Sequence, residues 1–319
     1  MDSSLSTPVL FVVFNRPDVT KRVFDEIRKQ RPRRLFVAAD GPRPDRDDDI
    51  LNCKNTRRII EEGVDWDCEL KLLFRKENLG CKYAVSSAIT WFFDQVDAGI
   101  ILEDDCLPDP SFFEFCTENL ERYKSDEDVF IISGQSTIFD HAENFRVPAA
   151  TNESYYFSKY PKIWGWATWK RVWQMYDAEL SDITFAEIKP ALEKIEVPYW
   201  SYIFDQLKKG NIDTWDYQLT YLMLKKRGMC ISPYNNMISN IGFGLQATHT
   251  FDGQSHFANN PLQPLKQITH SAKKEVNKLA DEYFFDKQIG GTKFKKPDNS
   301  LLARGIKKLK RIVKIPGRK

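Results

Sequence analysis

The chain has 319 residues, of which 42% are hydrophobic, and this is enough apolar material for a sizeable core. Its 47 Lys and Arg residues nearly balance its 45 Asp and Glu residues, which argues against a nucleic-acid-binding protein. Residues 1–7 do not read as a signal peptide, and no apolar run reaches the ~20 residues of a membrane-spanning helix. We therefore expect a protein that is cytoplasmic or peripheral on the cytosolic face of a membrane.

The first third of the sequence alternates between short apolar runs and helical periodicity. Residues 8–14 are a continuous apolar run, which predicts a buried strand, and Val19, Val23 and Ile27 then predict a helix over 18–30. The same alternation continues with strands at 35–39, 69–74, 99–102 and 129–133, and with helices at 50–62, 82–96 and 110–123. Strand–helix alternation of this kind predicts an α/β fold with a mostly parallel central sheet flanked by helices.

Polar junctions follow four of the predicted strands. They are Asn15-Arg16-Pro17, Asp40-Gly41-Pro42, residues 75–80 and the triplet Glu103-Asp104-Asp105. Because ligands bind at the carboxyl ends of the strands in such sheets, we expect these four junctions to line one crevice. Three adjacent carboxylates repel one another, so the triplet favours a cation or a sugar partner, although alone it would read as a solvated loop.

The second half is less regular. An aromatic block over 163–169 is followed by predicted helices at 185–195, 200–208 and 217–227, a strand at 229–231 and a loop at 241–250. Residues 266–299 are polar and predict a loose wrap or linker. Residues 300–319 carry eight Lys or Arg and no acid, with apolar residues at helical spacing. This tail predicts a basic amphipathic helix on an anionic membrane surface, or else a solvated or docked tail.

Taken in order, the junctions, the run Glu77-Asn78-Leu79-Gly80 and the pair Phe112-Phe113 after Pro108 resemble GT-A-fold nucleotide-sugar glycosyltransferases. The resemblance is to bacterial enzymes distantly similar to N-acetylglucosaminyltransferase I, and it covers about residues 8–250. It implies a Rossmann-like GT-A sheet with a smaller acceptor-side region. Residues 1–135 would be the nucleotide-sugar half and 136–265 the acceptor half, followed by the linker 266–299 and the tail 300–319.

The resemblance also assigns the donor site. Its donor-binding residues would be Asn15, Arg16, Asp40, Asn78, Gly80, Lys82, Glu103 and Asp104. Asp105 would bind a divalent ion, Mn²⁺ or Mg²⁺, and a late ligand at His249 would favour manganese. The alternatives are an ordinary turn at residues 15–17, a solvated helix lysine at Lys82 and a loop histidine bonded to backbone at 249.

On the acceptor side, the resemblance assigns two roles. Trp164 and Trp166 would stack on apolar sugar faces, with a core role open for Trp169. Asp216, at the start of a predicted helix, would be the general base that deprotonates the acceptor hydroxyl, or else only a helix cap.

These assignments predict a metal-dependent, inverting hexosyl- or N-acetylhexosaminyltransferase. It would use a UDP-sugar and a glycan or lipid-linked acceptor. One alternative is a sugar nucleotidyltransferase, although the first junction lacks the glycine-rich loop expected there. The other alternative is a non-catalytic nucleotide- or glycan-binding module.

Overall fold

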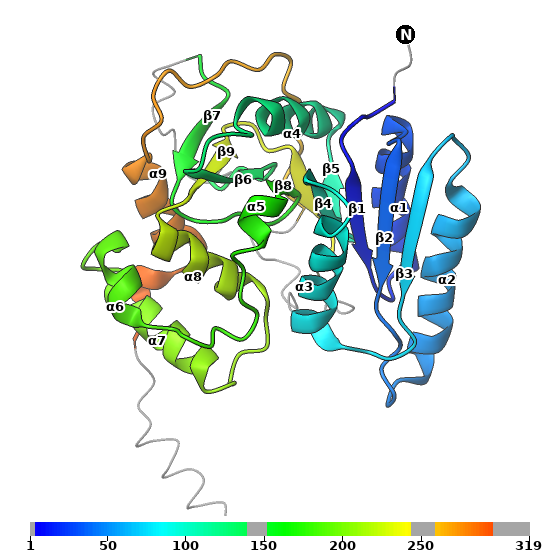
Figure 1. The fold of residues 1–319 in the computed structure, drawn as a ribbon, viewed down its shortest axis with the longest axis horizontal. Coiled ribbons are helices and arrows are strands. Elements are labelled where there is room, and N and C mark those ends of the chain that lie inside the picture. The colour runs from blue at the N-terminus through cyan, green and yellow to red at the C-terminus, as the bar shows by residue number, and fades with distance from the viewer. Residues whose placement is uncertain (1–3, 139–151, 244–258, 296–319) are drawn as a thin grey trace, which may run out of the picture.

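A computed structural model describes residues 4–138, 152–243 and 259–295. Its centre is one eight-stranded sheet in the order β3-β2-β1-β4-β8-β6-β9-β7 (Figure 1). The strands are β1 (Val9–Val13), β2 (Arg34–Ala39), β3 (Glu69–Phe74), β4 (Ala98–Glu103), β6 (Val129–Ser133), β7 (Tyr155–Ser158), β8 (Trp166–Trp169) and β9 (Met229–Pro233).

The first four strands are mutually parallel, and β1, β2 and β4 are covered on both faces, whereas β3 is a partly exposed edge strand. Helices α1 (Pro17–Gln30) and α2 (Asp47–Gly63) pack together on one face, and α3 (Gly80–Phe93) lies on the other (Figure 1). In α1, proline stands in the first turn, where its missing N–H is harmless, and Val23, Phe24 and Ile27 turn one apolar face to the sheet. The helices predicted at 18–30, 50–62 and 82–96 thus lie within two or three residues of those observed.

Strand β8 joins the two halves of the sheet, and no strand was predicted there. It lies antiparallel between β4 and β6, while β9 runs parallel to β6 and β7 antiparallel to β9. All four residues of β8 are buried, as expected of a central strand covered on both faces. The sheet is therefore mainly parallel and Rossmann-like, as predicted, and strands from before and after residue 135 share one core.

The remaining helices cover the second half of the sheet. They are α4 (Pro110–Arg122), α5 (Lys170–Trp173), α6 (Phe185–Ile188), α7 (Val197–Lys208), α8 (Asp216–Lys226) and α9 (Lys278–Tyr283). The helix predicted over 185–195 is shorter, because Pro190 lies in a 3-10 turn over Lys189–Ala191 that ends it. A second apolar cluster, which includes Trp200, Phe204 and Tyr221, packs α6, α7 and α8 together.

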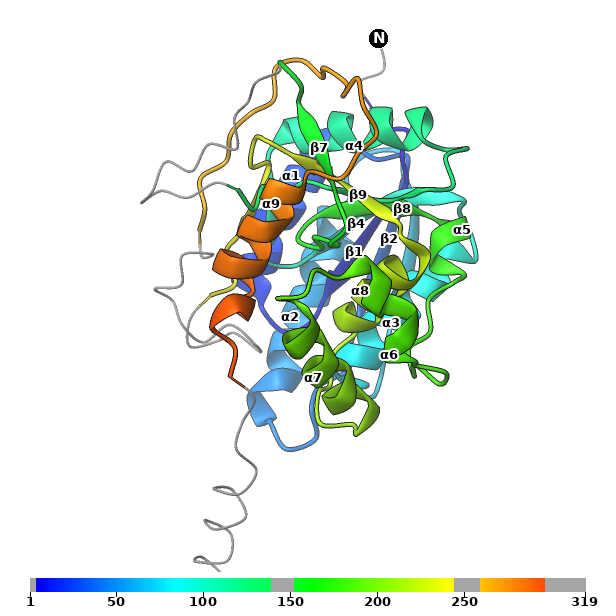
Figure 2. The same cartoon turned by 90° about the vertical axis from the view of Figure 1, so that its left-hand side faces the viewer.

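The segment 266–299 is more ordered than the predicted loose wrap, as far as residue 295. Helix α9 packs against β7 (Figure 2) and continues into a π turn over Phe284–Gln288. Phe285 in that turn is 1% exposed and belongs to the second apolar cluster, so this end of the segment is part of the fold.

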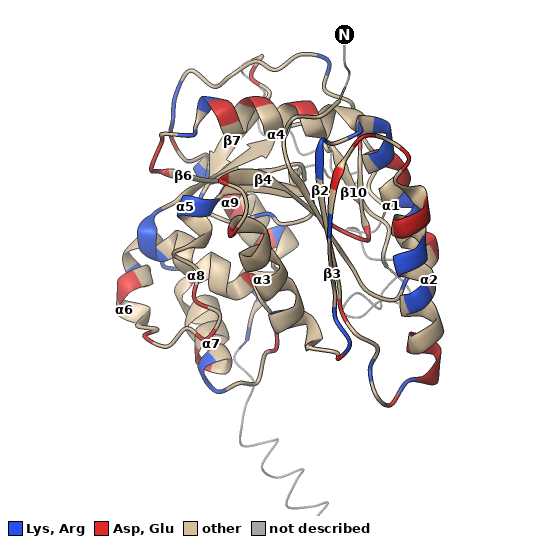
Figure 3. Ribbon diagram, turned by 45° about the vertical axis from the view of Figure 1, so that its right-hand side comes forward, with Lys and Arg blue, Asp and Glu red and all other residues tan. Residues whose placement is uncertain are grey.

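Charge is distributed unevenly over the helices. Figure 3 shows closely spaced acidic and basic residues along α1 and α2, whereas α3 is almost uncharged. No helix within residues 4–138, 152–243 and 259–295 is long and apolar enough to span a bilayer.

Candidate active site

A cavity of about 450 Å³ opens at the carboxyl ends of β1, β2 and β4. Most of the predicted site residues line it: Arg16, Asp40, Asn78, Gly80, Glu103, Asp104, Asp105, Trp164 and Asp216. Parallel pairing of β1 with β2 and β4 brings these junctions together from positions far apart in the sequence. The structure therefore places the four predicted junctions around one cavity.

Arg16 and the acidic triplet form the most polar wall of this cavity. The Arg16 guanidinium forks onto the Asp104 carboxylate through Nε and Nη2, and Nη2 also lies 3.1 Å from Asp105 Oδ2. Burial works to lower the pKa of Arg16, but the attraction of Asp104 and Asp105 outweighs it and raises that pKa above its ordinary value. A guanidinium therefore stands between two of the three carboxylates.

The pKa of Glu103 is shifted upward, in the same direction as that of Asp104. Burial raises its pKa to about 8, and repulsion from Asp105 and Asp104 adds to the rise. The raised pKa favours the protonated form of this carboxyl, which can donate a hydrogen bond as well as accept one.

Asp40 organises the loop that follows β3. Its carboxylate accepts bonds from the backbone N–H of Gly41 and Leu79 at 3.0 Å, and from Asn78 Nδ2 at 2.9 Å. Gly80, which begins α3, has φ +74°, a conformation that favours glycine. Since Asp40 already accepts several internal bonds, its main effect is to fix residues 78–80 at the cavity wall.

Asn15 does not line the cavity. Its Nδ2 donates to Asp49 Oδ1 at 2.6 Å, and the same carboxylate receives Arg43 Nε at 2.6 Å and Nη2 at 2.8 Å. Asp49 lies in the first turn of α2 and is 0% exposed. Asn15 thus anchors the end of β1 to α2, while Arg43 reaches the cavity.

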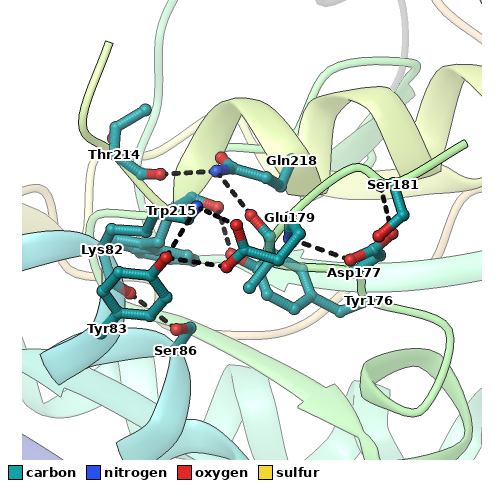
Figure 4. A network of polar contacts seen from close by, with 11 residues as sticks. Lys82, Tyr83, Ser86, Tyr176, Asp177, Glu179, Ser181, Thr214, Trp215 and Gln218 are labelled. Carbon is teal, nitrogen blue, oxygen red and sulfur yellow. Dashed lines mark hydrogen bonds and ion pairs between the residues drawn. The ribbon is translucent and has the colours of Figure 1, made fainter. Parts of the chain in front are cut away.

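Lys82 also points elsewhere. Figure 4 shows Lys82 and Tyr83 of α3 meeting Glu179, at 3.1 Å from Lys82 Nζ and 2.9 Å from the Tyr83 hydroxyl. These contacts tie α3 to the segment that precedes α6. The predicted donor role of Lys82 has no support in this arrangement, which is closer to the alternative of a surface helix lysine.

Asp216 is the first residue of α8 and lies at the cavity's far wall. It is not the cap: Trp215 occupies the N-cap position, and Asp216 Oδ1 accepts from the Thr214 hydroxyl. Gln218 Nε2 in turn donates to the Thr214 carbonyl at 2.7 Å (Figure 4). The Thr214 hydroxyl thus holds the carboxylate, and Gln218 in turn holds the Thr214 backbone.

The two predicted acceptor tryptophans have different environments. Trp164 is half-buried and meets Phe243 edge-on, with ring centroids 5.8 Å apart. Trp166 is 1% exposed in β8 and stacks on Trp215, so it has no face open to a sugar. We therefore treat Trp166 as a core residue, like Trp169, and keep Trp164.

A second cavity of about 350 Å³ adjoins the first, and Trp164 and Asp216 line both. Aromatic side chains form much of its wall: Tyr160, Tyr199, Trp200, Tyr217 and Phe284. Tyr199, Tyr217 and Phe284 are only partly buried, so their rings are open to a ligand. This cavity was not predicted, because its walls come from five separate segments.

Arg43 and Arg75 line the first cavity and were not predicted as site residues. Arg43 is committed to Asp49, whereas Arg75 donates to Ser87 Oγ at 2.8 Å and forms no ion pair with any described residue. Arg75 directly follows β3, and that position was its only signal in the sequence.

The acidic wall suits a divalent ion only in part. Asp104 and Asp105 already hold a cation, the Arg16 guanidinium, and their oxygens are ligands that Mn²⁺ and Mg²⁺ accept. Yet no cluster of three His, Cys, Asp or Glu side chains able to hold a metal occurs in the described part of the chain. The residues therefore fit an ion that brings further ligands with it. The predicted ligand His249 and the tail 300–319 lie outside the described residues.

The protein belongs to the α/β class: it has a Rossmann-like sheet, and a charged cavity lies at the strand ends. No family model and no curated protein matches the sequence. Among solved structures, residues 1–349 of Staphylococcus aureus TarS match at 12% identity and TM-score 0.37, over 54% of this chain and 51% of that one. The chain thus spans about half of the TarS fragment.

Two other solved structures match over more of the chain. UDP-glucose pyrophosphorylase complexed with UDP-glucose matches at 10% identity and TM-score 0.37, over 72% of this chain and 90% of that one. Mouse xyloside xylosyltransferase 1 matches at 10% identity and TM-score 0.35, over 70% and 82%. Likeness this low assigns no function to the chain.

Proposed function

We propose that this protein is a glycosyltransferase that moves a sugar from a UDP-sugar to a hydroxyl of a glycan or lipid-linked acceptor. The observation that carries the proposal is the pair of adjoining cavities, one charged and one aromatic, that share Trp164 and Asp216. A group-transfer enzyme with two substrates needs two subsites with a reactive group between them.

The first cavity is suited to the donor. Arg16 and Arg75 offer N–H donors to a diphosphate, and Glu103 and Asp104 offer oxygens to the sugar or ribose hydroxyls. Asp105 would hold a divalent ion, Mn²⁺ or Mg²⁺, whose charge would balance that on the departing UDP. A uracil base would then extend toward Asp40 and Asn78.

The second cavity is suited to the acceptor. The open rings of Tyr199, Tyr217 and Trp164 offer flat apolar surfaces, on which the apolar faces of sugars stack. Because Asp216 lines both cavities, it would lie beside an acceptor hydroxyl that faces the donor sugar.

Asp216 would take the proton from that hydroxyl as its oxygen attacks the anomeric carbon. The new bond forms between the acceptor oxygen and the anomeric carbon, and the bond to the UDP oxygen breaks, so that UDP leaves with the electron pair. Attack from the face opposite to UDP inverts the anomeric centre. Thr214, which donates to Asp216, would keep the carboxylate oriented.

The test compares Asp216→Asn with Asp213→Asn. Both carboxylates line the donor cavity, but only Asp216 also lines the aromatic one. Asparagine cannot accept the proton, so we expect Asp216→Asn to bind UDP normally and to lose transfer by about 10²-fold or more. Transfer would be followed as UDP release from a panel of UDP-sugars and simple glycosides.

In the control, Asp213→Asn should keep most of its transfer activity. Full activity in Asp216→Asn would remove the base assignment. Pyrophosphate formed from UTP and a sugar phosphate, with no UDP released from any UDP-sugar, would instead identify a nucleotidyltransferase.

A further inference from the structure

We propose that Arg16 makes divalent-ion binding conditional on the nucleoside diphosphate: it occupies Asp105 in the empty site and exchanges that carboxylate for a phosphate when the donor binds. The inference rests on the donor assignment of the proposed function. It concerns which cation the acidic wall holds before and after the donor enters.

The first step is the geometry of the pair. Arg16 uses Nε and Nη2 for Asp104 and the same Nη2 for Asp105, so its grip on Asp104 survives if Asp105 is released. Nη1 makes no hydrogen bond to any residue in the described ranges. Arginine therefore keeps one fixed partner and has donors left for a phosphate oxygen.

The second step is the packing around the pair. Side chains of Arg16, Asp104 and Asp105 are 14%, 5% and 15% exposed, so solvent screens the contacts only slightly. Gly242 lies against them, since a Cβ there would be 2.3 Å from Asp105 Oδ2 and 2.6 Å from Arg16 Nη1. The Arg16 side chain is thus enclosed by its neighbours, unlike a surface arginine, which samples many conformers.

The third step is competition for Asp105. An ion bound to Asp105 Oδ2 at the usual 2.0–2.6 Å would lie within about 6 Å of a guanidinium nitrogen that is 3.1 Å from the same oxygen. The two like charges repel, and the guanidinium already satisfies the carboxylate. Without a diphosphate, an incoming ion would therefore have to displace Arg16 and would gain few protein ligands.

The fourth step is the charge of the cavity. Acidic residues outnumber the arginines in its lining, and Arg43 is already neutralised by Asp49. A diphosphate adds more negative charge, so Arg16 gains a second anion to contact while the diphosphate supplies oxygens to the ion. Donor and ion then favour each other, which is a coupling between two ligands through one side chain.

The experiment measures Mn²⁺ binding to the full chain by titration calorimetry, with and without UDP. We expect wild-type protein to bind Mn²⁺ weakly alone and at least about tenfold more tightly with UDP present. Arg16→Gln should bind Mn²⁺ alone at least about tenfold more tightly than wild type, because Asp105 is released. Arg28→Gln is the matched control, because Arg28 pairs with Asp65 outside the cavity, and it should leave binding of Mn²⁺ alone unchanged.

Thermal denaturation gives a second readout if Arg16→Gln is unstable. Mn²⁺ alone should raise the Tm of Arg16→Gln and leave that of wild type unchanged, and Arg16→Lys, which keeps a charge without the fork, should respond in between. Equal Mn²⁺ affinity of wild type and Arg16→Gln without UDP would overturn the inference. Absence of UDP binding in every variant would instead overturn the donor assignment, because the comparison without UDP does not depend on it.

Discussion

The Asn15–Asp49–Arg43 network allows a stability prediction that tests how the first junction is held. Asp49→Ala removes a carboxylate that is 0% exposed and that accepts two bonds from the Arg43 guanidinium, one from the Arg43 backbone and one from Asn15. Breaking a buried ion pair by deleting one partner typically costs about 3–5 kcal/mol. Because the Arg43 side chain is 35% exposed and can rehydrate, we expect the lower end, about 3 kcal/mol.

Urea denaturation of both proteins at pH 7 measures this difference directly. For a chain of 319 residues the same loss lowers the Tm by roughly 4–5 °C. Asp48→Ala is the matched control. It removes one negative charge from the same first turn of α2, but the Asp48 side chain is exposed. If the two variants lose equal stability, the effect belongs to charge at the helix N-terminus and not to the network.

The same network predicts a pH dependence. Hydrogen bonding from Arg43 holds the pKa of Asp49 below its ordinary value of 3.8. A lowered folded-state pKa means that the carboxylate contributes its stability above pH 3.8 and loses it as the pH falls through the folded-state pKa. The stability difference between wild type and Asp49→Ala should therefore be constant from pH 7 to about 5 and shrink below 3.8.

Two further predictions test the tryptophan and loop assignments. Trp166→Ala should lower the free energy of unfolding by about 3–5 kcal/mol, because it empties a buried site against Trp215. Trp164→Ala should leave the free energy of unfolding in urea within about 1 kcal/mol of wild type and should weaken acceptor use. The reverse pattern would exchange the roles of the two residues. Asp40→Ala should lower stability by about 2 kcal/mol and weaken UDP binding in calorimetry, because residues 78–79 lose their acceptor. Unchanged UDP binding would show that this loop does not shape the donor cavity.

The first four strands were predictable because their signals are local. Strands β1, β2 and β4 are short apolar runs, helices of clear periodicity lie between the four strands, and parallel topology then requires the strand ends to meet. Strand β8 was not predictable in this way. Its sequence, Trp166 to Trp169, has no alternation, and its partners at 98–101 and 131–133 are distant in the sequence, so only tertiary pairing makes it a strand.

The positions of the site were easier to predict than the directions of its side chains. Arg16 and Asp104 were both expected at the crevice, but their mutual contact depends on how two neighbouring strands present the residues beyond their ends. The burial of Asp49 could not be predicted, because nothing local in the sequence distinguishes it from the exposed acids beside it. Lys82 was expected to face the donor and instead pairs with Glu179, a residue 97 positions away.

The acidic triplet shows why local charge counts mislead. Three carboxylates suggest a charge near −3, but burial raises the pKa of Glu103 and so favours its neutral form, and Arg16 pairs with Asp104 and Asp105. The wall therefore carries less negative charge than the three acids would in water. An ion at this wall would gain further oxygen ligands from a diphosphate. This balance is what the Arg16 variants would change.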